Sequence, residues 1–483
     1  MKSAHSESSK ATKESLTPRE MLTRDTFTAA ETAVFAMVIL LVAIATWLPP
    51  SVGWWILGLG LCLAALNPAV IRLHSLTHPF FISHLWRKWF ILLLPFWLIL
   101  FLYALGQWHP SLTTIANPSA GNELHALAPP GRFWPTVASL GLGWELVGRF
   151  AGVYLLAVLL FVVPKSRAFF LRLLPWLGLN AVLLALVGYL QRAFGWQMIL
   201  GLFDADGGNF FATFPSEVQW LAFAMLWAGV LSGLCLLHFR LEKSLTDFTR
   251  GLGPWYGSGA LVLLGTGLLC APGIHQIIFW LTATLLCAYF GWQFILSVRQ
   301  KSKVSLIPWT MASILATAVC LALAWHHWQA GFVSDGASMA TAWEMIRARP
   351  WFGWGADAFA AIAPFFNSDF SERMANNAGS DVLQWLSAFG WLGTFLILFL
   401  PLSLLIKELT ALLQFRLSTM LLLSLTGALA IACGQVVFEH YGFALSFWLL
   451  FFAALRWSQI SRTAADRVDQ KPYLILPHPQ SRT

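Results

Sequence analysis

Residues 143–163 read GWELVGRFAGVYLLAVLLFVV, and residues 164–172 follow them with PKSRAFFLR. The first stretch is mostly apolar and has the length of about 20 residues that a helix needs to cross the hydrocarbon core of a bilayer. Three cations, Lys165, Arg167 and Arg172, follow it directly. Short cytoplasmic connections keep Lys and Arg, whereas translocated connections lose them. The stretch therefore predicts a transmembrane helix that ends in the cytoplasm.

The same pattern recurs along the chain and predicts about twelve transmembrane helices. We expect them at residues 33–49, 52–71, 89–107, 143–163, 173–191, 215–237, 255–271, 274–297, 307–326, 382–406, 417–437 and 440–456. Of the 30 Lys and Arg residues, all but six lie in alternate connections or in the tails, and the six are Arg132, Arg149, Arg192, Arg347, Arg349 and Arg373. Both termini are therefore expected in the cytoplasm. The net charge of +8 is then explained by the membrane topology and does not indicate a nucleic-acid partner.

The composition agrees with an all-α polytopic membrane protein, since 58% of residues are hydrophobic and only 11% are charged. We expect a cytoplasmic tail at 1–32, nine transmembrane helices within 33–326, and a large extracytoplasmic loop with short helices at 327–381. Three further transmembrane helices follow within 382–457, and a cytoplasmic tail closes the chain at 458–483. The large outer loop thus separates the ninth helix from the tenth, and loops of this kind are where a site is built.

Metal, nucleotide and disulfide chemistry have little support in the sequence. The six cysteines all lie in apolar runs and form no CxxC pair, which favours membrane-core residues over a thiolate site. There is no phosphate-cradling or dinucleotide motif. Asp204 and Asp206 have the spacing of a metal-diphosphate pair, but a solvated turn is the favoured interpretation. We therefore expect no metal and no cofactor.

Four arginines on the outer side are candidates for binding a pyrophosphate. Glu145 and Arg149 are four residues apart, so they share one helix face and form either a simple salt bridge or a pair that aims Arg149 at an anion. Arg192 ends a span, where it either extends to the interface or reaches a phosphate. Arg347 and Arg349 precede Pro350 in the large loop. Guanidinium groups bind phosphate oxygens bidentately, so convergence of Arg149, Arg192, Arg347 and Arg349 would make a pyrophosphate site.

Tryptophan is abundant, with 26 copies, many of them near the predicted membrane edges. An aromatic belt at the membrane interface explains most of them. Trp351, Trp354 and Trp385 flank the large loop, and they are the candidates for lining a glycan or lipid groove. The large loop also carries a short helix, expected from Ser334 or Asp335 through Arg347 and ended by Pro350. The first long loop, 108–142, is rich in Pro, Gly and Asn and is expected to have little regular structure.

Two stretches resemble a known family. Residues 349–355 read RPWFGWG, and residues 381–393 read DVLQWLSAFGWLG. They resemble the core signature of the bacterial O-antigen ligase and O-antigen polymerase superfamily, in which R-P-x-x-G-x-G opens the large outer loop and H-N-D-Y-L-Q-x-x-x-E-x-G-x-x-G closes it. Weaker similarity lies at residues 211–214 with Trp220, and at 439–441 before the last span.

The resemblance implies a reaction. Members of the superfamily move a glycan from undecaprenyl pyrophosphate to an acceptor hydroxyl outside the membrane, and they need neither nucleotide nor metal. Arginines neutralise the leaving diphosphate, and a loop histidine is linked to the acceptor. Here the positions of the family histidine, asparagine and later glutamate hold Gly379, Ser380 and Ala388. Either Asp381, His440 or His327 takes the role of the base, or the substrate differs, or the protein binds without catalysis.

Two hypotheses follow from the resemblance. The first is a glycosyltransferase of polysaccharide biosynthesis in the bacterial inner membrane, with its site facing the periplasm or the exterior and with Asp381, Arg349 and His440 as catalytic candidates. The second is a non-catalytic relative that binds, moves or scaffolds a lipid-linked glycan. The expected partners are an undecaprenyl-pyrophosphate-linked glycan, membrane lipid and other polysaccharide assembly proteins, and no nucleic acid.

Overall fold

The computed structural model describes residues 29–48, 90–116, 123–127, 133–141, 143–196, 198–199, 203–204, 210–242, 245–271, 273–301, 307–329, 336–366 and 377–470. Within them, eight helices are long and apolar enough to cross a membrane, so the chain is an all-α multi-pass membrane protein. These are α6 (Trp144–Val162), α7 (Arg167–Phe194), α8 (Glu217–Leu241), α11 (Ile274–Lys301), α12 (Ile307–Gln329), α15 (Asp381–Gln414), α16 (Arg416–Gly434) and α17 (Tyr441–Gln470).

Three shorter helices lie where further spans were expected, and their crossing of the membrane stays a prediction. They are α2 (Ala29–Trp47), α5 (Leu94–Gly106) and α10 (Gly253–Gly265), and a short 3-10 turn, η2 (Thr266–Leu269), follows α10. A brief helix, α9 (Leu245–Arg250), lies between α8 and α10. The expected span at 52–71 falls outside the described residues.

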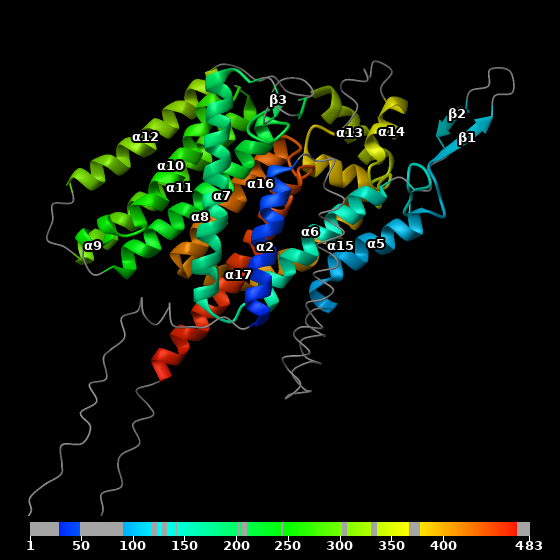
Figure 1. Ribbon diagram of the computed structural model, residues 1–483. Coiled ribbons are helices and arrows are strands. Elements are labelled where there is room, and N and C mark those ends of the chain that lie inside the picture. The colour runs from blue at the N-terminus through cyan, green and yellow to red at the C-terminus, as the bar shows by residue number, and fades with distance from the viewer. Residues whose placement is uncertain are drawn as a thin grey trace, which may run out of the picture.

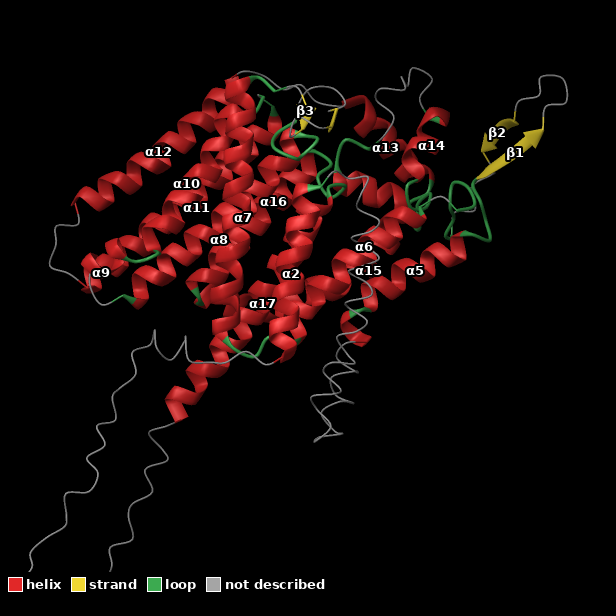
Figure 2. Cartoon of the chain, viewed as in Figure 1, coloured by secondary structure: helices red, strands yellow, loops and turns green. Residues whose placement is uncertain are grey.

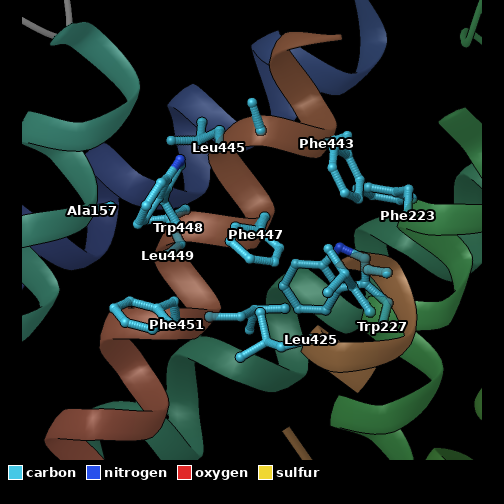
Figure 3. Packing of buried hydrophobic residues seen from close by; sticks show 14 of the residues in the cluster. Ala157, Phe223, Trp227, Leu425, Phe443, Leu445, Phe447, Trp448, Leu449 and Phe451 are labelled. Carbon is cyan, nitrogen blue, oxygen red and sulfur yellow. The ribbon is translucent and has the colours of Figure 1, made fainter. Parts of the chain in front are cut away.

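The bundle core lies around α17, as Figures 1 and 3 show. Phe447 of α17 points toward Trp227 of α8, whereas Trp448 lies beside Ala157 of α6 (Figure 3). The apolar window of α8 is 94% buried, which suits a helix that is hydrophobic on every side. The apolar window of α12 is only 11% buried, and this helix packs chiefly on α11. It is therefore a peripheral span with an exposed apolar surface.

The helix bundle has two chemically distinct ends. At one end, which we call the basic end, residues of four predicted cytoplasmic segments contact one another. The contacts are Glu31 with the Lys165 N–H, Arg167 with the Ser461 carbonyl, Arg456 with the Pro164 carbonyl, and Arg462 with Glu408. The opposite end, the loop end, holds the C-terminal ends of α2, α7, α12 and α16 (Figure 1). The cation-rich segments therefore lie together at one end of the bundle, as the charge pattern predicts.

Two short helices form part of the connection between α12 and α15, and both lie at the loop end (Figure 1). They are α13 (Gly336–Ala348) and α14 (Ala358–Ile362), which the 3-10 turn η3 (Ala363–Phe365) extends. They enclose a small hydrophobic core of their own, which includes Ala342, Met345, Trp354, Phe359 and Ile362. The expected helix before Pro350 is confirmed as α13, and residues 334–335, which we expected at its start, are outside the described residues.

The loops contain a little β-structure that we did not expect (Figure 2). β1 (Leu112–Ala116) pairs antiparallel with β2 (Glu123–Leu127), with Thr114 opposite His125. β3 (Met198–Ile199) and β4 (Phe203–Asp204) form a second, shorter pair. The expectation of little regular structure at 108–142 was therefore wrong for this hairpin. Its first strand reads LTTIA, whose β-branched residues favour a strand despite the Pro- and Gly-rich flanks.

Candidate functional site

The motif segment, residues 349–355, lies against a break in helix α15. Gly390 interrupts α15 with a φ of 65°, and the freed N–H groups of Trp391 and Leu392 donate to the carbonyls of Pro350 (2.7 Å) and Trp351 (3.1 Å). On the other side of the break, the N–H groups of Trp354 and Gly355 donate to α15 carbonyls at 2.8 Å each. The two stretches that resemble the family signature are thus bonded to each other through their backbones.

Glycine is required in this segment because two backbones approach closely. Gly353 and Gly355 have φ values of 64° and 100°, which side chains rarely adopt. A Cβ at Gly353 would lie 2.5 Å from the Ser387 carbonyl oxygen, and one at Gly390 would overlap the Trp351 backbone. The glycines of the sequence motif therefore serve the packing of the loop against the broken helix.

Arg349 lies inside the protein, where it joins two loops. Its side chain is 3% exposed, and it donates to the Ser111 hydroxyl at 3.1 Å and to the Thr136 hydroxyl. Its guanidinium also lies 5.0 Å above the Trp354 ring. Burial lowers the pKa of Arg349 to about 10, and the group stays protonated at neutral pH. Arg349 thus anchors the loop that precedes α6 to the motif segment.

Arg149 lies at the centre of a second group of polar residues, the Arg149 cluster, made of Glu145, Arg149, Asp357, Glu439 and Tyr441. Arg149 pairs with Glu145 at 2.8 Å, as the spacing of the two residues predicts. It also donates to the Glu439 carbonyl at 3.2 Å and lies 4.8 Å above the Tyr441 ring. Its side chain is 26% exposed. A partly exposed guanidinium beside carboxyl groups is suited to binding a ligand that carries both phosphate and hydroxyl groups.

The two other carboxyl groups of the cluster come from distant segments. Asp357 follows the motif segment and Glu439 precedes α17. Desolvation raises the pKa of both groups, and Arg149 opposes the rise in each. Glu145 raises the pKa of Asp357 further, and Asp357 does the same for Glu439. One guanidinium is therefore surrounded by more carboxyl groups than it neutralises.

Asp357 holds its place through an unusual backbone conformation. Its φ is 55°, a region that Asp tolerates better than most residues because its short side chain bonds locally. Here the carboxylate accepts a hydrogen bond from the Leu146 N–H in the first turn of α6. The first-turn N–H groups of a helix lack helical partners, so Asp357 stabilises the start of α6 from another segment.

Asp381 stabilises the bend that carries Glu439. It is 6% exposed, and its carboxylate accepts N–H bonds from Val437 at 2.7 Å and from Phe438 at 3.2 Å. Both donors belong to the turn between α16 and α17. Because its oxygens are engaged by the backbone, Asp381 is placed to shape the site. Its role as an acid or base stays a prediction.

His440 is buried beside the cluster. It is 3% exposed, and its ring stacks on Phe214 with a centroid distance of 4.0 Å. Burial first, and then the positive charge of Arg149, lower the pKa of His440 to about 3, so the imidazole is neutral at physiological pH. His327, the other histidine considered above, lies in the last turn of α12.

The remaining predicted arginines have partners of their own. Arg192, in the last turn of α7, pairs with Glu217 at the start of α8. Arg347 is exposed on α13, where its guanidinium lies 5.6 Å from the Trp343 ring. The structure thus brings Arg149 next to residues of the motif loop, and each of the four arginines contacts protein groups. Their convergence on one pyrophosphate stays a prediction.

The three candidate groove tryptophans differ in exposure. Trp354 is fully buried and donates from Nε1 to the Met345 carbonyl at 2.9 Å, so its ring packs inside the loop core and faces no open groove. Trp351 is 44% exposed and stacks on Phe133. Trp385 is half-buried, with its ring edge-on to Phe150 at 5.7 Å. Trp351 alone among them presents a largely open surface.

Sequence reasoning singled out neither Asp357 nor the carboxyl group of Glu439. Asp357 stands two residues after the last glycine of the motif segment, and this position in the sequence was the feature that could have indicated it. In the described part of the chain, no three His, Cys, Asp or Glu side chains form a group that could hold a metal ion. The carboxyl groups of the cluster surround the guanidinium of Arg149. Asp204 of the expected metal pair lies in β4, and residues 205–206 are outside the described residues.

Comparison with known proteins adds no further constraint on the site. No protein-family model matches this chain, and no curated protein matches it either.

Proposed function

We propose that this protein transfers a glycan from an undecaprenyl-pyrophosphate carrier to an acceptor hydroxyl in cell-surface polysaccharide synthesis. The transfer needs no nucleotide and no metal, because cleavage of the pyrophosphate linkage supplies the driving force. In this proposal about twelve helices cross a bacterial inner membrane, both termini are cytoplasmic, and the loop end faces the periplasm or exterior.

The observation that carries the proposal is the Arg149 cluster beside the motif segment. A leaving diphosphate needs a fixed positive charge, and a guanidinium provides it without losing its proton. A sugar hydroxyl needs acceptor oxygens, and Glu439 and Asp357 provide them. Arg149 is held by three different contacts and is still 26% exposed. This combination favours Arg149 over the buried Arg349 as the residue that meets the pyrophosphate.

The orientation in the membrane rests on charge. The connections at the basic end include Lys165, Arg167, Arg456 and Arg462, which the positive-inside tendency assigns to the cytoplasm. The Arg149 cluster lies at the opposite end of the bundle. A labelling experiment checks this orientation. In a cysteine-free variant, a cysteine in place of the exposed Phe365 should react with a membrane-impermeant maleimide in intact cells whose outer barrier has been opened, and one in place of Arg250 should not.

A second function, binding of a lipid-linked glycan without transfer, is favoured by a different observation. Arg349 and Asp381, the residues that the family resemblance selects, are engaged in contacts within the protein. A protein that only holds or passes on a glycan needs the shape of the loop end and no reactive group. The two functions differ in whether the glycan leaves its carrier.

Gene deletion with complementation tests the proposed function. Loss of the protein should shorten or remove one surface polysaccharide and cause its lipid-linked precursor to accumulate. Wild-type protein should restore the polymer, and Arg149→Ala should not. Arg250→Ala is the matched control, because Arg250 is exposed in α9 on the basic side of the bundle. Normal polysaccharide made by the Arg149→Ala variant at wild-type abundance would refute the proposal.

A further inference from the structure

The bend between α16 and α17, residues 435–440, is held from two sides. Asp381 accepts N–H bonds from Val437 and Phe438, and Arg149 binds the Glu439 carbonyl. The backbone on either side of the Glu439 side chain is therefore fixed by charged groups. A reactive side chain gains from such a support, because its position is set before the substrate arrives.

Buried polar atoms without partners lie next to this bend. The Nδ1 atom of His440 and the Nε atom of Arg149 are buried and form no hydrogen bond within the described residues. His440 is 3% exposed, and it lies close enough to Arg149 for that charge to lower its pKa. An unpaired buried polar atom loses its bonds to water without replacing them, so two such atoms in one place point to a polar ligand.

The other candidate bases are less accessible. Asp381 is 6% exposed and its oxygens accept backbone N–H bonds, and His440 is stacked under Phe214. Asp357 is half-buried and accepts the Leu146 N–H. Glu439, in contrast, is exposed to solvent at the edge of the cluster. Accessibility therefore selects Glu439 among the acidic and basic groups that surround Arg149.

We propose that Glu439 is the catalytic base of this protein, taking the proton of the acceptor hydroxyl while Arg149 faces the leaving pyrophosphate. This assignment rests on the proposed glycan transfer and deepens it, because it names a carboxylate where the family resemblance implies a histidine. It also indicates the acceptor, which is a sugar hydroxyl placed at the accessible carboxylate of Glu439.

The step balances without a further reactant. The acceptor oxygen forms a bond to the anomeric carbon of the glycan, and the bond between that carbon and the pyrophosphate oxygen breaks. The leaving undecaprenyl pyrophosphate keeps the bonding electron pair, and Arg149 stabilises its charge. The acceptor proton passes to the Glu439 carboxylate, which returns it to water before the next turnover.

The charged groups around Glu439 determine the pH above which its carboxyl group is deprotonated. Arg149 faces it from α6, Asp357 from the motif loop and Asp381 from α15, while Glu145, His440 and Tyr441 act on the same cluster through Arg149. Desolvation and Asp357 raise the pKa of Glu439, and Arg149 opposes them. A base must be deprotonated, so the rate should rise with pH, and the rise should lie above the ordinary titration range of a carboxyl group.

The test uses full-length protein added to membranes from a strain that lacks it. Such membranes contain the native lipid-linked glycan and its acceptor, and release of undecaprenyl pyrophosphate is measured as a function of pH. Glu439→Gln should lower the rate by about 100-fold or more, which is typical of losing acid–base help, and should remove the acidic limb of the profile. Glu439→Asp should recover part of the rate, because it restores a carboxylate.

Glu344→Gln is the matched control, since Glu344 is an exposed residue of α13 outside the cluster, and it should keep the wild-type rate. The thermal midpoint of each purified variant separates a chemical loss from unfolding. If Glu439→Gln is as stable and as fast as wild type, with an unchanged pH profile, the assignment of Glu439 falls while glycan transfer stands. If wild-type protein releases no undecaprenyl pyrophosphate, the proposed function itself falls.

Discussion

Asp381 provides a sharp test because its structural and chemical roles predict opposite results. Its carboxylate accepts N–H bonds from Val437 at 2.7 Å and from Phe438 at 3.2 Å, and it is 6% exposed. Hydrogen bonds to charged groups contribute about 1.5–3 kcal/mol each. Asp381→Ala removes both acceptors and leaves two N–H groups without these partners, so it should lower the free energy of unfolding by about 3–6 kcal/mol.

Asp381→Asn should be much milder, because the amide keeps one acceptor oxygen and loses about half of that contribution, about 2 kcal/mol. The assay is the thermal midpoint of purified protein in detergent, read beside the rate of glycan transfer. If each kcal/mol moves the midpoint by about 2 °C, Asp381→Ala should lower it by about 6–12 °C. The Asn variant should retain most of its transfer rate.

A different outcome would make Asp381 the acid or base. In that case Asp381→Asn would lose about 100-fold or more in rate while melting at the wild-type temperature. Such a result would refute the interpretation that this carboxylate serves to hold the bend, and it would move the chemistry from Glu439 to the start of α15.

Three more predictions follow from the loop end. Gly390→Ala should lower the thermal midpoint more than Gly141→Ala, because both have positive φ values but only Gly390 lies against another backbone; equal losses would contradict the packing argument. Arg349→Lys should reduce the amount of folded protein almost as much as Arg349→Met, since a lysine cannot bridge the hydroxyl groups of two loops, and full rescue by lysine would show that charge alone matters. Desolvation raises the pKa of Asp357 and Glu439, so the folded chain holds protons that the unfolded chain releases above about pH 4; their contribution to stability falls as pH rises, and Asp357→Asn should flatten that dependence in thermal melts between pH 4 and pH 7.

The sequence predicted the helices well because their signal is local. An apolar run of about 20 residues is visible without knowing its neighbours, and α6, α8 and α16 lie where such runs were expected. The Glu145–Arg149 pair was also predictable, since four residues along a helix bring two side chains to one face. The end of α13 before Pro350 is local in the same sense.

The site was only partly predictable because it is built from distant segments. Glu439 meets Arg149 through a contact between residues 290 positions apart, and no periodicity reports such a distance. Arg349 resembled a ligand-binding residue because its motif is conspicuous. Its burial depends on hydroxyl partners 238 and 213 positions away, in a loop whose structure the sequence alone did not predict. The burial of Trp354 was unpredictable for the same reason, since the small core that buries it forms from α13 and α14 together.

Release of undecaprenyl pyrophosphate by purified protein tests the account most directly. Wild-type protein is reconstituted with lipid-linked glycan extracted from the deletion strain and with membranes that carry the acceptor, and both the freed carrier and the lengthened acceptor are quantified. The account predicts that the two products appear in equal amounts and that Arg149→Ala forms neither while remaining folded. Tight binding of the glycan by wild-type protein with no release of the carrier would contradict it.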